Sequence, residues 1–151
     1  MTPGKTNPPA PRLSDWPGSP RDWLEAFGTF DHAIAYAGLF WPDFVTHDGC
    51  IFLEFDETAY REWMNQTSGD RQAVEATMNH RHIRDLFSHA DAKPTRERLV
   101  QLGRLLRQMW ECKLQRDFPE RQVVVRFLEE GCDDLLDYEI TFFQESASAA
   151  A

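Results

Sequence analysis

The stretch from Pro94 to Phe143 constrains the fold most, because its apolar residues recur first with a helical period and then with a strand period. On a helical wheel of about 100° per residue, the apolar side chains between Leu99 and Leu114 share one broad arc, and the opposite arc is polar. This pattern predicts a long helix with one buried side, which Pro94 can begin and Pro119 cannot continue. The arc contains Leu99, Leu102, Leu105, Leu106, Met109, Trp110, Cys112 and Leu114.

Two residues on this arc are unusual for a buried helix side. Gly103 weakens a helix by roughly 1 kcal/mol relative to alanine, so we expect another element to cross closely there. The ammonium group of Lys113 must either reach water along its own stem or find a carboxylate, and a buried functional lysine is the alternative. Cys112 is expected to be a small apolar filler.

After Pro119 the apolar period changes to two, in residues 123–128 and again in residues 136–143, which predicts a β-hairpin. A turn centred on Gly131 and Cys132 would place Arg126 opposite Asp137. One face of this hairpin is fully apolar and is expected to pack on the long helix.

A second, shorter hairpin is predicted around Asp48 and Gly49, the preferred pair for a two-residue type I′ turn. Its register places His47 opposite Cys50, where an imidazole and a thiol could form a nucleophilic pair. No third orienting group is identifiable, and polar residues commonly flank turns, so the favoured interpretation is a structural one.

Three further helices precede residue 80. Ser19 and Pro20 begin one that runs to Trp41, with an aromatic stripe that we expect to face the core rather than line a ligand pocket. Asp56 and Asp70 are predicted to cap two shorter helices.

These elements predict an α+β fold in which about five helices pack on one face of a small antiparallel sheet made of the two hairpins. Residues 20–145 would form a single globular domain. Residues 1–19 would be a disordered, proline-rich tail, and residues 146–151 a frayed C-terminus.

The composition narrows the function classes. A net charge of −9 disfavours nucleic acid, although Arg104 and Arg107 offer a small basic face. No apolar run is long enough to cross a membrane, and there is no secretory signal. The three cysteines have unrelated spacings, which indicates a reducing compartment, so we expect a cytoplasmic protein. No motif points to a cofactor, and the sequence does not indicate an oligomeric state.

The segment from Asn79 to Asp91 is the only one rich in metal-ligand residue types. On a helix, His82, Asp85 and His89 would share one face, and imidazoles with a carboxylate suit zinc or iron. A metal-dependent enzyme using His80, His82, Asp85, His89 and Asp91, with His47 as a further candidate, is therefore one hypothesis. Against it, the reach from His82 to His89 is roughly 10 Å by helix rise, and Arg81 and Arg84 would repel a cation.

The run from Glu129 to Glu145 carries seven acids and no base. Such a one-signed field attracts a cationic partner and raises its association rate. The leading hypothesis is therefore a small acidic protein that binds a basic protein partner, in the manner of inhibitors such as immunity proteins. The residues expected to bind that partner are Glu129, Glu130, Asp133, Asp134 and Asp137.

Overall fold

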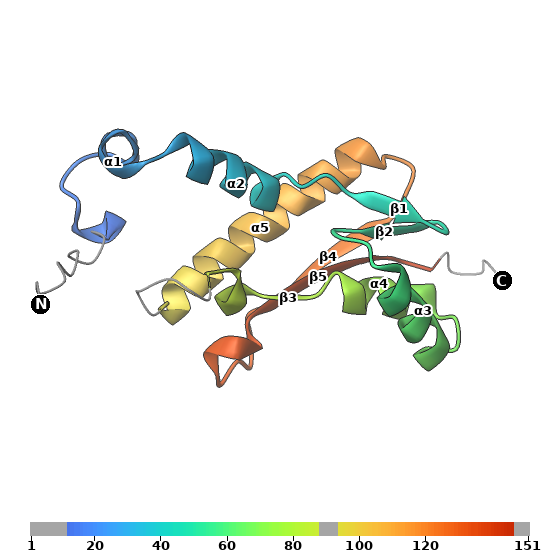
Figure 1. Ribbon diagram of the computed structural model, residues 1–151. Helices are drawn as coiled ribbons and strands as arrows, with labels where there is room; N and C mark the ends of the chain where they lie inside the picture. The colour runs from blue at the N-terminus through green and yellow to red at the C-terminus, as the bar shows by residue number, and fades with distance from the viewer. Residues whose placement is uncertain (1–11, 88–93, 147–151) are drawn as a thin grey trace, which may run out of the picture.

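The computed structural model describes residues 12–87 and 94–146, which form five α-helices and two small antiparallel sheets (Figure 1). The predicted tail over residues 1–11 and the frayed end over residues 147–151 lie outside the described residues. In the described part of the chain, no helix has both the length and the apolar character of a membrane span. The helices are α1 (Pro20–Phe27), α2 (Phe30–Phe40), α3 (Glu57–Gln66), α4 (Arg71–Met78) and α5 (Arg96–Asp117), and the strands are β1 (Val45–His47), β2 (Cys50–Phe52), β3 (Arg81–His82), β4 (Val123–Leu128) and β5 (Glu139–Gln144).

Helix α5 packs on the sheet made by the last strands, as its apolar period predicts. Thr95 caps the helix by accepting a hydrogen bond from the Arg98 amide, and the sheet order is β3-β5-β4. Trp110 of α5 meets Phe142 of β5 edge to face, with ring centroids 6.0 Å apart. The main core therefore lies between α5 and this sheet.

Gly103 is the point of closest approach between α5 and the sheet. A Cβ atom at this position would lie 2.2 Å from Cζ of the Phe127 ring on β4. The prediction that another element crosses there is confirmed, because the aromatic ring occupies the space that any side chain would need.

The buried side of α5 is narrower than the predicted arc. Leu105 is 43% exposed and Cys112 is exposed, so the prediction that Cys112 fills the core is wrong. Both residues lie at the margins of the arc, beyond the part that the sheet covers. Lys113 is buried, and its ammonium is paired with the Asp117 carboxylate and lies 3.9 Å from Asp43. Of the two outcomes expected for this ammonium group, water or a carboxylate partner, the structure therefore shows the carboxylate partner.

The register of the C-terminal hairpin differs from the expected one. Arg126 pairs with Thr141 and not with Asp137. The connection is longer than a tight turn because residues 135–137 form a 3₁₀ turn, η3 (Leu135–Asp137), in which Asp134 and Asp137 make a capping box. These hydrogen bonds remove Asp137 from the strand and shift the pairing by four residues.

The shorter hairpin forms as predicted, with His47 opposite Cys50 and positive φ angles at Asp48 and Gly49. However, the two hairpins do not join into the single sheet that the sequence predicted. β1 and β2 form a sheet of their own, while β3 adds to the edge of β5 in the other. A two-residue strand after α4 leaves too weak a periodic signal to be expected from sequence.

Two buried polar side chains, one on α4 and one on the residue that caps its C-terminus, connect the two sheets. The Glu75 carboxylate accepts hydrogen bonds from the Ile51 amide of β2 (2.7 Å) and the Gln144 amide of β5 (2.7 Å). One turn later, the Asn79 side chain accepts from the Leu53 amide (2.9 Å) and donates to the carbonyls of Ile51 (2.9 Å) and Phe142 (3.2 Å).

This arrangement satisfies strand edges that would otherwise be unpaired. β3 pairs with β5 only as far as Ile140, and the backbone of β5 beyond that point meets α4 instead of a further strand. An unpaired buried amide or carbonyl is costly, so Glu75 and Asn79 replace a backbone ladder with side-chain groups. Both side chains are at most 1% exposed.

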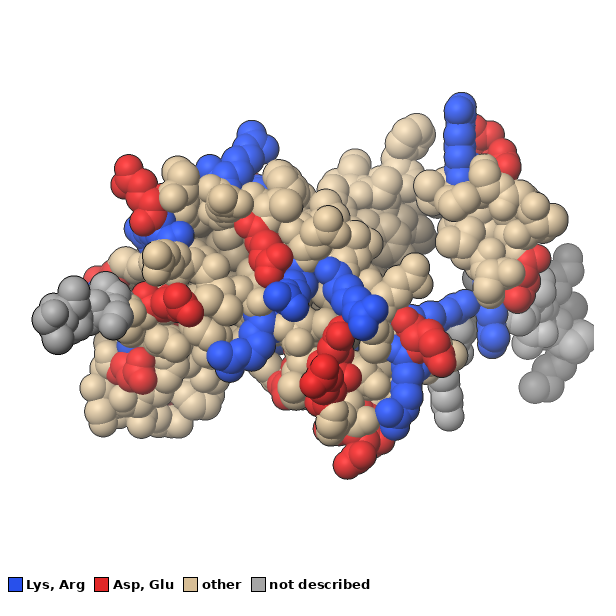
Figure 2. Space-filling view, turned by 180° about the vertical axis from the view of Figure 1, so that it is seen from behind, with Lys and Arg blue, Asp and Glu red and all other residues tan. Residues whose placement is uncertain are grey.

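The predicted N-terminal helix is divided into α1 and α2, because Gly28 ends the first and the Thr29 hydroxyl caps the second. Neither helix has a buried residue, so the expectation that their aromatic stripe faces the core is wrong. In Figure 1, α1 stands off from the rest of the molecule, and α2 leads back towards α5. We call α1 and α2 together the arm; in Figure 2 its α1 end lies at the upper right.

Within residues 12–87 and 94–146, the contacts that hold the arm to the rest of the protein lie at its C-terminal end. Trp110 of α5 donates a hydrogen bond from Nε1 to the Leu39 carbonyl (2.9 Å), and the Tyr36 ring lies 5.9 Å from the Phe87 ring, centroid to centroid. At the other end, Trp16 and Trp23 pack on Phe27, which gives α1 a small aromatic cluster of its own.

Candidate functional site

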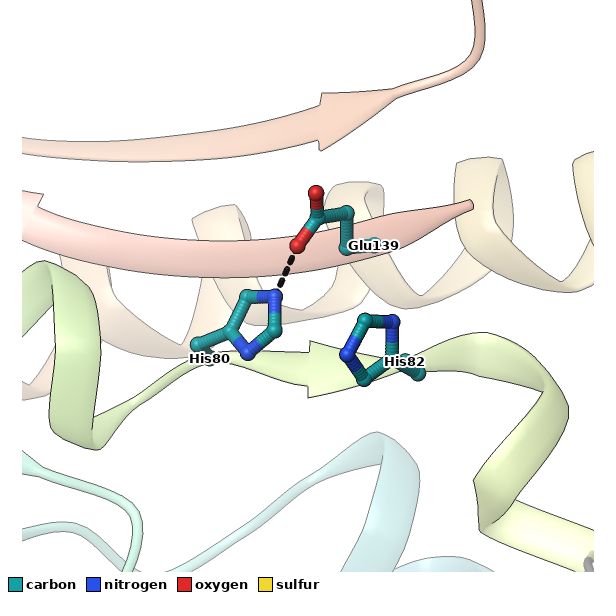
Figure 3. A group of neighbouring side chains, drawn as sticks. All are labelled: His80, His82 and Glu139. Carbon is teal, nitrogen blue, oxygen red and sulfur yellow. Dashed lines mark hydrogen bonds and ion pairs between the residues drawn. The ribbon is translucent and has the colours of Figure 1, made fainter. Parts of the chain in front are cut away.

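A cluster of metal-ligand residue types lies on the three-stranded sheet, on the face opposite to the one that packs on α5. His80, His82 and Glu139 each place one potential ligand atom within 4.8 Å of the others (Figure 3). His82 lies directly opposite Glu139 across β3 and β5, and His80 precedes β3 by one residue. Because side chains alternate along a strand, His80 and His82 lie on one face, together with Glu139 opposite His82. The next residue of β5, Ile140, points to the other face and is buried against α5.

Hydrogen bonds fix the orientation of both imidazoles. Nε2 of His80 is hydrogen bonded to the Glu139 carboxylate. Nδ1 of His82 lies 2.6 Å from the Leu136 carbonyl oxygen, and since a carbonyl only accepts, Nδ1 carries the proton. The two rings meet edge to face, with centroids 4.6 Å apart. Figure 3 shows the second nitrogen of His82 turned towards His80.

The predicted metal residues are therefore only partly brought together. The helix on which His82, Asp85 and His89 would share a face does not form in the described part of this segment, where the chain makes β3 and the 3₁₀ turn η2 (Ile83–Phe87). Asp85 lies on η2 and does not belong to the described cluster, while His89 and Asp91 lie outside the described residues.

Glu139 is the site residue that the sequence reasoning missed. Its pairing with His82 depends on β3 adding to the edge of β5, a contact between residues far apart in the chain. The available signal was the spacing of His80 and His82, because residues two apart share a face in a strand and not in a helix.

The acids of the C-terminal connection are largely engaged within the protein. Glu129 accepts two hydrogen bonds from the Arg104 guanidinium (2.8 and 2.9 Å), which lowers the pKa of its carboxyl. Asp137 accepts from the backbone amides of Asp133 and Asp134, and Asp134 accepts from the Leu136 amide. By contrast, the carboxylates of Glu130 and Asp133 have no hydrogen-bond or ion-pair partner within residues 12–87 and 94–146.

The proposed pairing of His47 with Cys50 does not produce an activated thiol. Cys50 is 1% exposed, and burial raises the pKa of its thiol, which opposes thiolate formation. The His47 ring stacks on Phe55 (centroids 4.4 Å apart) and meets Tyr60 edge to face. These contacts fit a structural role for both residues.

We expect the three cysteines to differ sharply in reactivity. Under native conditions at neutral pH, Cys112 should be alkylated quickly, whereas Cys50 and Cys132 should be protected, because both are buried and burial raises their thiol pKa values. Intact-mass analysis over time after adding iodoacetamide should reveal one fast modification, and peptide mapping should place it at Cys112. If Cys50 were modified as fast as Cys112, the Cys50 thiol would not be protected, and the hypothesis of a nucleophilic pair formed by His47 and Cys50 would be supported again.

The arm presents the other surface of interest. Its large apolar side chains are uncovered, including Phe30 at 90%, Ile34 at 73% and Leu24 at 60% exposed. Phe27 and Tyr36 are also exposed, so the apolar surface continues along both helices. Several large apolar side chains exposed on one segment are typical of a surface that binds another molecule.

No family model matches the chain, and comparison with curated proteins and with solved structures finds no match either.

Proposed function

We propose that this protein binds a basic protein partner and that the arm provides the contact surface. The observation that carries the proposal is the exposure of Phe30 and Ile34 on α2, a helix with no buried residue. Large exposed aromatic and aliphatic side chains act as anchors when a partner pocket removes them from water. Isolated exposed apolar residues are ordinary, but two consecutive helices without a buried residue are not.

Charge supports a basic partner. The arm carries Asp22, Glu25 and Asp31 against a single base, Arg21, and the whole chain has a net charge of −9. Acids around an apolar contact attract a cationic surface over a distance of about a Debye length, which raises the association rate and suppresses acidic competitors. In this proposal the acidic connection between β4 and β5 contributes to attraction, mainly through Glu130 and Asp133, whose carboxylates have no hydrogen-bond or ion-pair partner among the described residues.

The arm can be changed without disturbing the core. In the double variant Phe30→Ser and Ile34→Ser, we expect a loss of partner binding of at least about 100-fold, because anchor residues typically contribute 2 kcal/mol or more each. The folded body should remain intact, because neither side chain is buried. Circular dichroism and thermal unfolding check the fold, and quantitative pull-down from the native host followed by titration of the purified partner measures binding.

Leu105→Ser is the matched control, because Leu105 is an exposed apolar residue on α5, outside the arm. It should bind the partner as the unaltered protein does. Ser substitution of Glu130 and Asp133 should slow association and make it less sensitive to salt. The proposal fails if the arm variant retains the same partners, if the partner is acidic, or if sedimentation shows that the arm only joins two copies of this chain.

A further inference from the structure

We propose that His80, His82 and Glu139 bind one divalent transition-metal ion, and that Zn²⁺ is the best match. Two imidazoles and a carboxylate are ligands that zinc accepts in tetrahedral sites. Their potential ligand atoms already lie within 4.8 Å of one another. Ligand atoms about 2.0–2.2 Å from a tetrahedral zinc ion are roughly 3.5 Å from one another. Side-chain rotations that move the ligand atoms by about 1 Å would therefore complete the site.

The sheet places the ligands on a rigid base. Glu139 belongs to β5, the central strand of its sheet, and the opposing residue is His82 of the edge strand β3. The His80 ring reaches the same carboxylate from the residue before β3. An ion bound here would join β3 to β5 by coordination in addition to their short hydrogen-bonded ladder.

The hydrogen bond from His82 to the Leu136 carbonyl has the form of an outer-shell contact in metal sites. With the proton held on Nδ1, Nε2 keeps its lone pair and is the atom available for a metal. At His80, the ion would take the place of the proton that lies between Nε2 and the Glu139 carboxylate. Through exchange with solvent the proton would move from Nε2 to Nδ1, so the His80 ring stays neutral while the Nε2 lone pair and one carboxylate oxygen coordinate the ion.

The surroundings suit a cation and leave room for water. The side chains of His80 and Glu139 are each about one third exposed, so a water molecule or a partner group can fill the fourth position. Arg81 does not occupy the site, because strand alternation directs it to the other face, where its guanidinium lies 3.5 Å from Glu54. With neutral imidazoles, the ligand set carries the single negative charge of Glu139.

Titration calorimetry of the full, untagged chain with Zn²⁺ tests the site. We expect one ion per chain. His82→Ala should weaken binding more than about 100-fold, because losing even a group that only orients a ligand costs 10–100-fold. Glu139→Gln should weaken it similarly while keeping the size of the side chain. Circular dichroism of each variant shows whether the fold is retained, and Glu139→Gln keeps the test valid if His82→Ala does not fold.

His47→Ala is the matched control, because the His47 side chain is 35% exposed against 34% for His80 and also has two carboxylates within 4.0 Å. It should bind zinc with unchanged affinity. Co²⁺ substitution gives a second readout, since nitrogen and oxygen ligation lacks the sulfur charge-transfer band that a cysteine ligand produces. No binding, a sulfur band, or equal losses in the His82 and His47 variants would overturn the proposal.

Discussion

Replacing Glu75 by alanine is expected to lower the free energy of unfolding by about 3–4 kcal/mol, because an unpaired buried polar group costs about 1–3 kcal/mol. The substitution removes the acceptor from two backbone amides, those of Ile51 and Gln144, which belong to different sheets. It also removes the acceptor for the Gln144 side-chain amide (2.6 Å). Urea denaturation at neutral pH measures the change.

Two variants make this test specific to the hydrogen bonds by which Glu75 connects the two sheets. Glu75→Gln retains one acceptor oxygen and should lose less stability than Glu75→Ala. Glu62→Ala removes an exposed acid from the neighbouring helix α3 and should change stability by no more than about 0.5 kcal/mol. If Glu75→Ala costs no more than Glu62→Ala, the hydrogen bonds that Glu75 accepts do not hold β2 and β5 together.

Gly103→Ala is expected to destabilise the protein by about 2 kcal/mol, although alanine favours a helix over glycine by roughly 1 kcal/mol. The new methyl group would lie 2.2–2.7 Å from three atoms of the Phe127 ring, so the ring or the helix must move. Overpacking of this kind costs about 1–3 kcal/mol and here outweighs the gain in helix propensity. Thermal and urea unfolding should both report the loss.

Gly38→Ala provides the opposite expectation. Gly38 also lies within a helix, α2, but nothing approaches the position of its Cβ within 4 Å. The substitution should therefore stabilise α2 by about 0.5–1 kcal/mol through helix propensity alone. A stabilising effect of Gly103→Ala would contradict the close contact between α5 and β4. So would a double variant, Gly103→Ala with Phe127→Leu, in which the smaller side chain does not reduce the loss of stability caused by Gly103→Ala.

The elements governed by local rules were predictable from the sequence. The 3.6-residue period of α5 required one buried side, and Asp48-Gly49 required a tight hairpin turn. The glycine at position 103 indicated the close crossing that Phe127 makes. The caps at Ser19, Asp56 and Asp70 are also where the sequence placed them.

Features that depend on contacts between distant residues were not predictable. The apolar stripe of α1 and α2 satisfies the rule for a core-facing helix, yet a periodic pattern cannot distinguish a surface buried within the chain from one left for a partner. The capping box at Asp134 altered the hairpin register. The position of Glu139 beside His80 and His82 required the pairing of β3 with β5.

Site-directed photo-crosslinking in the native host tests the central claim, that the arm binds a basic protein, most directly. A photoreactive amino acid at position 30 should produce a covalent adduct with a basic protein, and the same group at position 105 should produce none. Equal adducts at both positions, or adducts at position 30 with this chain alone, would contradict the account.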